Sequence, residues 1–377
     1  MLNKIDENLL NKISTKNTKI DKTRVIVYLK KYEKNIKKIE AQFEDIIRLP
    51  LISSVALNVD TNKILGIAKN EYVNYISEAS KACTLTYNLR RFLNLTYLEK
   101  IQRNYDTTVA VIDTGIYPHI DFLLGKNKVI KFVDLINYKE KMYDDNGHGT
   151  FVSGVICGWG IVNKYYGFDK NCNIISIKAL DSNGETDTTK ILEAMQWVLD
   201  NKDRYNITTV CMSFGSLYRQ GDPLIMGAEV LWNNGIVVVT AGGNSGPERS
   251  TIMSPGTSRR VITVGSLDSV KNGEIKVADF SSRGPINNCY KPDMVLPGVD
   301  IISCSVFEQT KTFYTSMSGT SVSTPMVAGI CSILKSINPR YTPNQIKYML
   351  LSACTPIEHD RNKEGYGYLD LNNIKLL

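Results

Sequence analysis

A serine stands at the start of an apolar segment near the end of the chain. Residues 318–325 form a Gly-Thr-Ser turn rich in small side chains, and the apolar residues 326–330 follow it directly. The pattern predicts that Ser321 lies at the N-terminus of a helix, where backbone N–H groups and the helix dipole favour negative charge. A hydroxyl in that place suits nucleophilic attack, although the same turn by itself would also suit an ordinary helix N-cap.

Two further stretches carry the residues that such a serine needs. A buried-strand pattern over residues 109–112 ends at Asp113, and His148 lies between two glycines in Asn-Gly-His-Gly-Thr. A serine hydroxyl is a weak nucleophile at neutral pH, so it needs a base, and His148 is the best candidate among three histidines. Because an unpaired buried carboxylate is costly, Asp113 is expected to bond to the imidazole and hold it in place.

These motifs, in the order Asp, His, Ser, resemble those of the subtilisin-like serine proteases, the subtilase family. The resemblance runs from about residue 95 to the C-terminus. It implies that Asp113, His148 and Ser321 form a triad that hydrolyses peptide bonds through an acyl-enzyme. By the same resemblance His119 belongs to a structural His-x-Asp turn, whereas His359 is expected at the surface.

The resemblance also implies an oxyanion donor and the segments that bind substrate. Asn244, in Thr-Ala-Gly-Gly-Asn, matches the side-chain amide that acts in the family together with the backbone N–H of the serine. The substrate backbone is expected to pair with two exposed edges, and Met253 is placed near the floor of the pocket for the side chain preceding the cleaved bond. The two edges are Ser213, Phe214 and Gly215, and Ala241, Gly242 and Gly243.

Many subtilases carry a calcium loop soon after the histidine motif. Here that region, residues 158–167, has few oxygen-bearing side chains, whereas calcium takes six or more oxygen ligands. We therefore predict no cofactor and leave a calcium ion as an alternative without a clear site.

Strand and helix patterns alternate from residue 93 to residue 374. This alternation predicts an α/β fold, a mostly parallel sheet with helices on both faces. The resemblance implies that this fold is of the subtilisin-like kind. Ahead of it we predict a small α+β ferredoxin-like domain. The expected boundaries are 1–82 for the small domain, 83–100 for a linker and the start of the mature chain, and 101–377 for the peptidase domain.

The small domain is predicted from alternating and helix-periodic apolar residues. Its pattern indicates strands at 24–29, 51–59 and 64–68, helices at 34–48 and 71–82, and a last strand near 83–89. Ahead of a subtilase domain it resembles the propeptide of that family, a folding chaperone whose tail inhibits the active site. The predicted cleavage lies between residues 81 and 91, and the alternative is an unrelated accessory domain.

The composition limits the classes of binding partner and the cellular compartments that the sequence predicts. The formal charge is +7, but lysines alternate with glutamates along helical patterns, so a solvated face is favoured over a nucleic-acid surface. No run reaches the length of a membrane span, and the first residues carry acids where a signal peptide needs basic and apolar ones. The eight dispersed cysteines suit buried, reduced thiols. We therefore predict a cytoplasmic protein.

The sequence predicts a serine endopeptidase that acts on polypeptides and is made as a self-cleaving zymogen. The missing export signal motivates a narrower hypothesis, the processing of one specific peptide precursor. The alternative from another class is a catalytically silent subtilase-fold binding or regulatory module, which the loss of a triad residue would have favoured. A related acid-active family replaces the histidine with glutamate, and the Gly-His-Gly-Thr stretch argues against that reading.

Overall fold

The structure is a computed structural model, and it divides the chain into two compact units, Met1–Ala82 and Cys83–Leu377. It describes residues 4–5, 9–10, 13, 22–43, 46–78, 90, 92–268, 275–286 and 288–377. The predicted strand at 83–89 and nearly all of the predicted cleavage region lie outside these residues.

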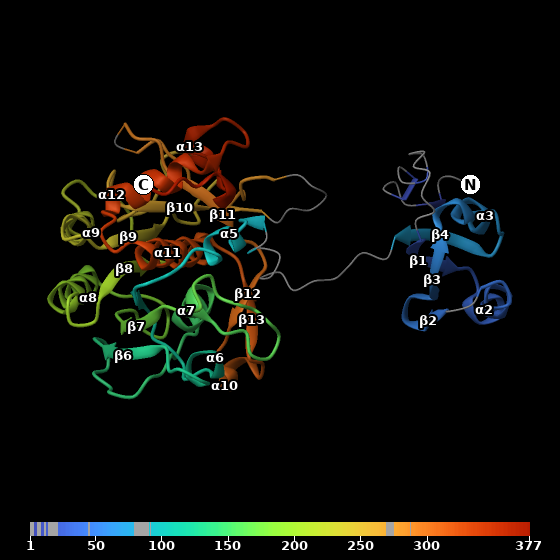
Figure 1. The fold of residues 1–377 in the computed structure, drawn as a ribbon, viewed down its shortest axis with the longest axis horizontal. Coiled ribbons are helices and arrows are strands. Elements are labelled where there is room, and N and C mark those ends of the chain that lie inside the picture. The colour runs from blue at the N-terminus through green and yellow to red at the C-terminus, as the bar shows by residue number, and fades with distance from the viewer. Residues whose placement is uncertain are drawn as a thin grey trace. The chain divides into compact units, whose positions relative to one another are not determined.

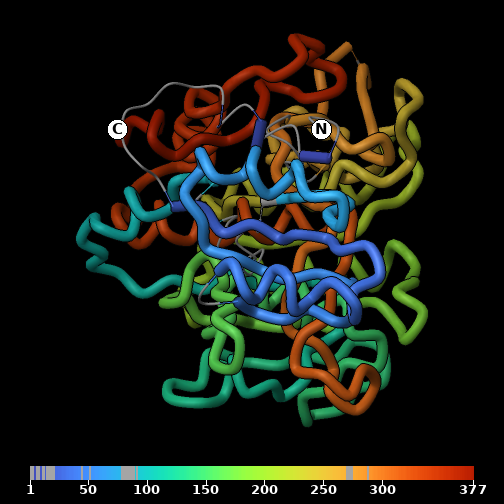
Figure 2. Tube along the Cα trace, turned by 90° about the vertical axis from the view of Figure 1, so that its right-hand side faces the viewer, coloured from blue at the N-terminus to red at the C-terminus, as the bar shows by residue number. Residues whose placement is uncertain are grey.

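The first unit is a four-stranded antiparallel sheet in the order β2-β3-β1-β4, with two helices on one face (Figure 1). This is the strand order of a ferredoxin-like arrangement. Figure 2 shows the unit in blue, with α2 coiled against the strands. Its elements are β1 (Lys22–Leu29), α2 (Tyr32–Glu40), β2 (Ile47–Leu49), β3 (Ser54–Asp60), α3 (Ile64–Ala68) and β4 (Val73–Glu78), with 3₁₀ turns at Pro50–Ile52 and Thr61–Lys63.

Two predicted elements of this unit are wrong. Ile64–Ala68 is a helix and not a strand, and Val73–Glu78 is a strand where a helix was predicted. The cause is visible in the pairing of β4 with β1, whose register shifts between Tyr28 and Leu29. Because of this bulge, Val73 and Ile76 both point inward although they are three residues apart, which imitates helical spacing. The predicted helix at 34–48 also ends early, at Glu40.

The second unit contains a nine-stranded sheet within the described residues, in the order β14-β15-β11-β10-β9-β8-β5-β7-β6. All pairs in it are parallel except β14 with β15, so the predicted mostly parallel sheet is confirmed. Its strands are β5 (Thr108–Asp113), β6 (Val129–Asp134), β7 (Asn173–Lys178), β8 (Ile207–Met212), β9 (Val237–Ala241), β10 (Ile262–Leu267), β11 (Met294–Pro297), β14 (Cys354–Thr355) and β15 (Tyr368–Leu369).

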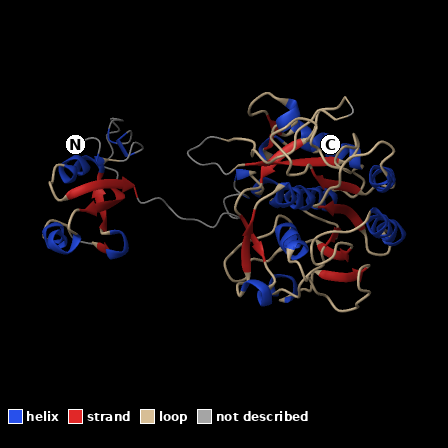
Figure 3. Cartoon of the chain, turned by 180° about the vertical axis from the view of Figure 1, so that it is seen from behind, coloured by secondary structure: helices blue, strands red, loops and turns tan. Residues whose placement is uncertain are grey.

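Helices cover both faces of this sheet (Figure 3). Figure 1 shows α8 and α9 on one face and α7 and α11 on the other. The helices are α5 (Thr96–Glu99), α6 (Ile120–Leu123), α7 (His148–Cys157), α8 (Thr188–Asn201), α9 (Pro223–Asn233), α10 (Phe307–Thr310), α11 (Thr320–Ile337), α12 (Pro343–Ser352) and α13 (Arg361–Glu364), with a 3₁₀ turn at Leu371–Asn373 and a separate hairpin of β12 (Ile301–Cys304) and β13 (Tyr314–Met317).

Burial explains why the central strands are apolar along their whole length. Every residue of β5, β8, β9 and β10 is buried, because helices cover both faces of the sheet.

Seven cysteines are described and all are free thiols, five of them buried. None of the helices among the described residues has the length and apolar character that a bilayer crossing requires.

Candidate active site

The first component of the site is a carboxylate at the end of the central strand β5, which lies between β7 and β8. Asp113 is the last residue of this strand and is 1% exposed. Its Oδ1 accepts hydrogen bonds from the Thr114 N–H at 2.8 Å and from Nδ1 of His148 at 2.8 Å. Its Oδ2 is buried and has no partner among the described residues. The structure therefore joins the predicted acid directly to the predicted base.

The turn before α7 fixes His148, the first residue of that helix. Gly147 precedes it with a φ of 101°, in the left-handed region that favours glycine. The buried Asp144 organises the turn: Oδ1 accepts from the Gly147 N–H at 2.8 Å and from the Thr114 hydroxyl at 2.9 Å. Oδ2 accepts from the backbone N–H and hydroxyl of Thr150, so one carboxylate ties the histidine turn to the end of β5.

The two motif loops touch at a pair of glycines. A Cβ built on Gly149 would lie 2.2 Å from the carbonyl oxygen of Gly115 and 3.2 Å from the Cβ of Asp113. No side chain fits in that space, so only glycine lets the first turn of α7 come this close to the end of β5.

The electrostatic surroundings adjust the basicity of His148. Burial lowers the pKa of its imidazole, but the charge and hydrogen bond of Asp113 outweigh burial, so the net pKa is raised above its ordinary value. About a quarter of the side chain remains exposed. The ring is therefore a stronger base than a free imidazole and still opens toward solvent.

Sequence reasoning missed Asp144 and a buried lysine beside it. Lys178, which pairs with Asp113 in the β5–β7 register, is fully buried, and its Nζ donates to the carbonyls of Thr114 and Leu180 and to Asp145 Oδ1. It ties together three chain segments at this edge of the sheet. The available signals were an acid two residues before Asn-Gly-His and a lysine at the end of an apolar strand.

Ser321 is the second residue of α11, close to its predicted place. Asn244 lies against the same turn, where its Oδ1 accepts from the backbone N–H of Thr320 at 2.9 Å and from the Thr320 hydroxyl at 3.0 Å. This fixes the amide so that Nδ2 is left to donate elsewhere. A Cβ built on Gly319 would lie 3.1 Å from Nδ2 of Asn244 and 3.1 Å from Oγ of Ser321, so both atoms border the same small space beside Gly319.

Helices α7 and α11, which carry His148 and Ser321, pack directly against each other. A Cβ on Gly329 would lie 3.3 Å from the carbonyl of Ile156. Ile156 lies eight residues after His148, and Gly329 lies eight residues after Ser321, so this contact aligns the two N-terminal turns. No hydrogen bond joins Ser321 to His148 among the residues that the structure describes. Catalytic hydrogen bonds are often long without substrate, so this geometry remains compatible with a nucleophile and its base.

The two predicted substrate edges differ in the structure. Ser213 and Phe214 line a cavity of about 250 Å³ that also borders Asp113 and His148. The backbone N–H and C=O groups of residues 213–215 make no hydrogen bond within the described chain, so this edge is free to pair with a peptide.

The second predicted edge is already occupied. The Gly242 N–H donates to Val264, and its carbonyl accepts from Met253. The Gly243 N–H donates to the Thr320 hydroxyl, and its carbonyl accepts from Ser282. With Ala241 buried at the end of β9, these residues can form a wall of the site but cannot add a strand there.

Met253 lies between the two segments. A Cβ on Gly215 would lie 2.6 Å from the Cβ of Met253, and a Cβ on Gly243 would lie 2.7 Å from its Cγ. The side chain of Met253 therefore occupies the space between the free edge and the occupied one.

The comparisons with known proteins agree with this arrangement. A sequence model described as the subtilase family matches residues 104–368. The chain belongs to the subtilase family. It is 39% identical over 292 residues to Serine protease AprX of Bacillus subtilis (strain 168), a match that covers 71% of this chain and 65% of the relative. It is 32% identical over 250 residues to Subtilisin DY of Bacillus licheniformis, covering 66% of this chain and 83% of the relative.

Solved structures support the fold. Sphericase matches with a TM-score of 0.65 at 24% identity, over 76% of this chain and 97% of that one. S41 Psychrophilic Protease matches with a TM-score of 0.67 at 24% identity, over 78% of this chain and all of that one. The chain covers less than two thirds of the length of the first curated relatives, with 65%, 62% and 48% of their lengths matched.

Subtilases often bind calcium, but the loop after the histidine motif of this subtilase does not fit that ion. Its backbone N–H groups point inward: those of Gly160 and Ile161 donate to the two carboxylate oxygens of Asp121, at 2.8 and 3.0 Å. The Tyr314 hydroxyl donates to the same carboxylate at 3.0 Å. Calcium takes six or more oxygen ligands, and the Asp121 carboxylate beside this loop is already used by these three donors. Asp121 therefore holds the loop itself.

A second metal arrangement near this loop also fails. His119, Asp121 and Cys304 are buried together with their ligand atoms within 4.8 Å of one another. However, Nδ1 of His119 accepts from the Asp121 N–H at 3.1 Å and Nε2 bonds to the Phe313 carbonyl at 2.7 Å. Both ring nitrogens are used, so His119 is the structural residue that the sequence predicted.

Proposed function

We propose that this chain is a serine endopeptidase that cleaves peptide bonds through Asp113, His148 and Ser321. One observation carries the proposal: the 2.8 Å bond between the buried Asp113 carboxylate and the imidazole of His148, in a chain of the subtilase family. The relatives' names, Serine protease AprX and Subtilisin DY, support the same activity.

The proposed reaction forms and breaks an acyl-enzyme. His148 accepts the proton of the Ser321 hydroxyl while the oxygen attacks the substrate carbonyl. Asp113 holds the tautomer with the proton on Nδ1 and stabilises the imidazolium that forms. The imidazolium then protonates the leaving amine, and a water molecule, deprotonated by His148, releases the acid product and restores Ser321.

The negative charge that develops on the carbonyl oxygen needs donors. The Nδ2 of Asn244 and the backbone N–H of Ser321, at the start of α11, are the proposed pair. Because Thr320 fixes the side-chain amide oxygen of Asn244, the amide nitrogen Nδ2 is already oriented before substrate arrives. A pre-oriented donor of this kind is worth about 10²–10³ in turnover.

Substrate seating follows from the two edges. We propose that the peptide backbone pairs with the free groups of Ser213, Phe214 and Gly215, and lies against the wall made by Ala241, Gly242 and Gly243. The volume that Met253 fills favours small side chains before the cleaved bond.

We also propose that Met1–Ala82 is a propeptide, removed by self-cleavage between residues 81 and 91, and that the mature enzyme processes a specific peptide precursor in the cytoplasm. The compact, separately folded first unit supports the first part. The free thiols of the second unit are compatible with a reducing compartment. Until it is cleaved off, this propeptide would inhibit the active site of its own chain.

A fluorophosphonate probe, intact mass and N-terminal sequencing test these proposals together. Wild type should be labelled at Ser321 and split between residues 81 and 91, whereas Ser321→Ala should stay unlabelled and full length. Ser318→Ala is the matched control, because Ser318 is exposed in the same turn and should not matter for labelling.

The outcomes separate the parts of the proposal. A chain that is labelled but stays full length would support the proposed peptidase activity and contradict the proposed self-cleavage. A chain that is neither labelled nor cut would instead be the silent binding or regulatory module. A broad digest of unfolded proteins by the labelled enzyme would argue against a specific precursor.

A further inference from the structure

A polar cavity of about 340 Å³ lies at the opposite end of β5 from Asp113. Its walls come from the segment that leads into β5, the segment that leads into β7 and the last turn of α11, and they include Arg103, Asp106, Asp169 and Ser336. Since β5 spans Thr108–Asp113, this cavity is about 16 Å along the strand from the triad. It is therefore separate from the proposed active site.

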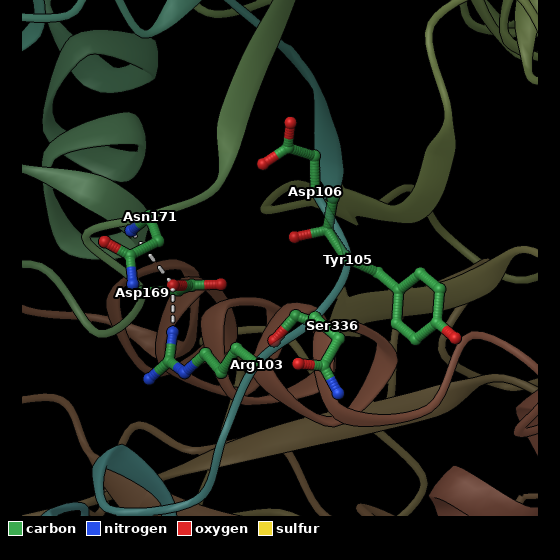
Figure 4. A pocket seen from close by; sticks show the side chains of 8 residues that line it. Arg103, Tyr105, Asp106, Asp169, Asn171 and Ser336 are labelled. Atoms are coloured by element: carbon green, nitrogen blue, oxygen red, sulfur yellow. Dashed lines mark hydrogen bonds and ion pairs between the residues drawn. The ribbon is translucent and has the colours of Figure 1, made fainter.

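A buried acceptor without a partner points into this cavity. Asp169 is 1% exposed, and its Oδ1 accepts from Arg103 at 2.7 Å and from the Asn171 N–H at 3.1 Å. Its Oδ2 is buried and has no partner among the described residues. Figure 4 shows this second oxygen pointing into the cavity, away from Arg103 and Asn171. A buried carboxylate oxygen without a donor is costly, so this atom marks a place for a donor group.

A second carboxylate shares the cavity. Asp106 lies across the opening from Asp169, on the segment that leads into β5, and its side chain is exposed (Figure 4). One guanidinium and two carboxylates leave this cavity with a net negative charge. A protonated amine supplies both the donors and the positive charge that it lacks.

An adjoining cavity of about 300 Å³ has the opposite character. It shares Asp106 and Asn171 with the first cavity and is lined by Lys126, Lys128, Lys170 and Trp159. The shared residues make the two cavities neighbours. Three lysines around one space favour an anionic group.

A residue that lines the second cavity carries a donor without an acceptor. The Nε1 of Trp159 is buried and unpaired within the described part of the chain. Lys128 is buried beside it, lies 4.2 Å from the centre of the Trp159 ring and donates to the Lys170 carbonyl. Burial, followed by the charge of Arg90, lowers the pKa of Lys170. An anion placed here would accept from the indole and relieve the repulsion among the cations.

We propose that the two cavities form one binding site for a short peptide with free termini, with its ammonium group at Asp169 and Asp106 and its carboxylate at the lysines and Trp159. Each cavity is far larger than one ion needs, which favours an organic ligand over a metal. Short peptides are also products of the proposed peptidase, and to that extent the biological meaning of the site rests on the proposed function.

Calorimetric titration of the full-length Ser321→Ala chain with L-alanyl-L-alanine tests the site without any need for activity. We expect saturable binding that weakens about tenfold or more when the dipeptide is N-acetylated or C-amidated, because each change removes one charged partner. Free alanine serves as a further arm: equal binding would assign the site to a single amino acid and would overturn the proposed peptide ligand. Calcium chloride binding in place of the dipeptide overturns the proposal.

Two variants locate the binding. Asp106→Asn changes an exposed residue, and Trp159→Phe keeps the aromatic ring under Lys128 while it removes the indole donor. Each should weaken dipeptide binding about tenfold, whereas Asp279→Asn, at a 97% exposed carboxylate outside both cavities, should leave it unchanged. Thermal unfolding of each variant confirms that it is folded. Unchanged binding in both variants, or equal binding of the blocked peptides, contradicts the proposal, and neither result bears on labelling at Ser321.

Discussion

Two buried carboxylates in nearly the same state lie near opposite ends of β5. Asp113 and Asp169 are each 1% exposed, each accepts one backbone N–H and one side-chain nitrogen through Oδ1, and each keeps a buried Oδ2 without a partner in the described structure. The difference is the side-chain partner, which is His148 for Asp113 and Arg103 for Asp169.

That difference decides which end can move a proton. An imidazole gains and loses a proton near neutral pH, so the Asp113 carboxylate can adjust a base. A guanidinium stays charged throughout that range, so the Asp169 pair is a fixed ion pair. Burial and geometry are shared, and the chemistry follows from the titration of the partner.

The largest expected effect concerns the catalytic end. Asp113→Asn should lower the turnover number of a peptide substrate by about 10⁴, because the imidazole loses its orienting carboxylate and takes the wrong tautomer. Steady-state kinetics measure this, with Asp279→Asn as the control. A loss below about tenfold would show that Asp113 does not act through His148.

The opposite end should respond in stability. Asp169→Asn should lower the free energy of unfolding by about 3 kcal/mol, since Arg103, 14% exposed at its side chain, would keep a charge without its partner. Urea unfolding between pH 5 and pH 9 should give the same loss throughout, because the guanidinium does not titrate there. A loss that disappears above pH 7 would contradict the fixed pair.

The Asp121 carboxylate tests whether the loop at residues 158–167 is held without a calcium ion. Asp121→Asn should cost about 2 kcal/mol of unfolding free energy, because an amide cannot accept from Gly160, Ile161 and Tyr314 together. Thermal unfolding with added calcium or with a chelator should show that calcium does not restore the loss. Recovery in calcium would place an ion in this loop after all.

The pocket beside the catalytic end should change its selectivity. Met253→Ala should raise kcat/KM about tenfold for substrates with a large side chain before the cleaved bond, relative to alanine there, because the side chain between Gly215 and Gly243 is shortened. Met226→Ala is the control, since Met226 is exposed on α9. An unchanged preference would remove Met253 from the pocket.

The smallest effect is a displacement of the pH profile. The raised pKa of His148 means that kcat/KM should fall with falling pH around a midpoint above the ordinary 6.5, because the protonated ring cannot accept the Ser321 proton. In Asp113→Asn the residual activity should persist to lower pH. A midpoint below 6.5 in wild type would show that burial outweighs the Asp113 charge.

The central strands could be predicted because each is apolar along its whole length. Helix α9, Pro223–Asn233, begins and ends at the predicted residues, since Asp222 accepts from the Leu224 N–H and a proline follows at the first helical position. Short elements gave no such signal. Strands β14 and β15 have two residues each, and the bulge beside Tyr28 disguised β4 as a helix.

The site was predictable where chemistry selects a residue type. Asp113, His148 and Asn244 were predicted from their motifs, whereas Asp144 and Lys178 act through contacts that only the fold creates. The sequence also could not show that the backbone groups of Gly242 and Gly243 are already hydrogen-bonded, because their partners Val264 and Ser282 are distant in sequence.

The contact between Gly149 and Gly115 has a meaning for the motif itself. In the Gly-His-Gly sequence, the second glycine performs no chemistry, yet a single methyl group there would push two backbones apart. A chain could keep its aspartate, histidine and serine and still be unable to bring them together. The two glycines therefore set how closely the two backbones can approach, and the reactive residue between them depends on that distance.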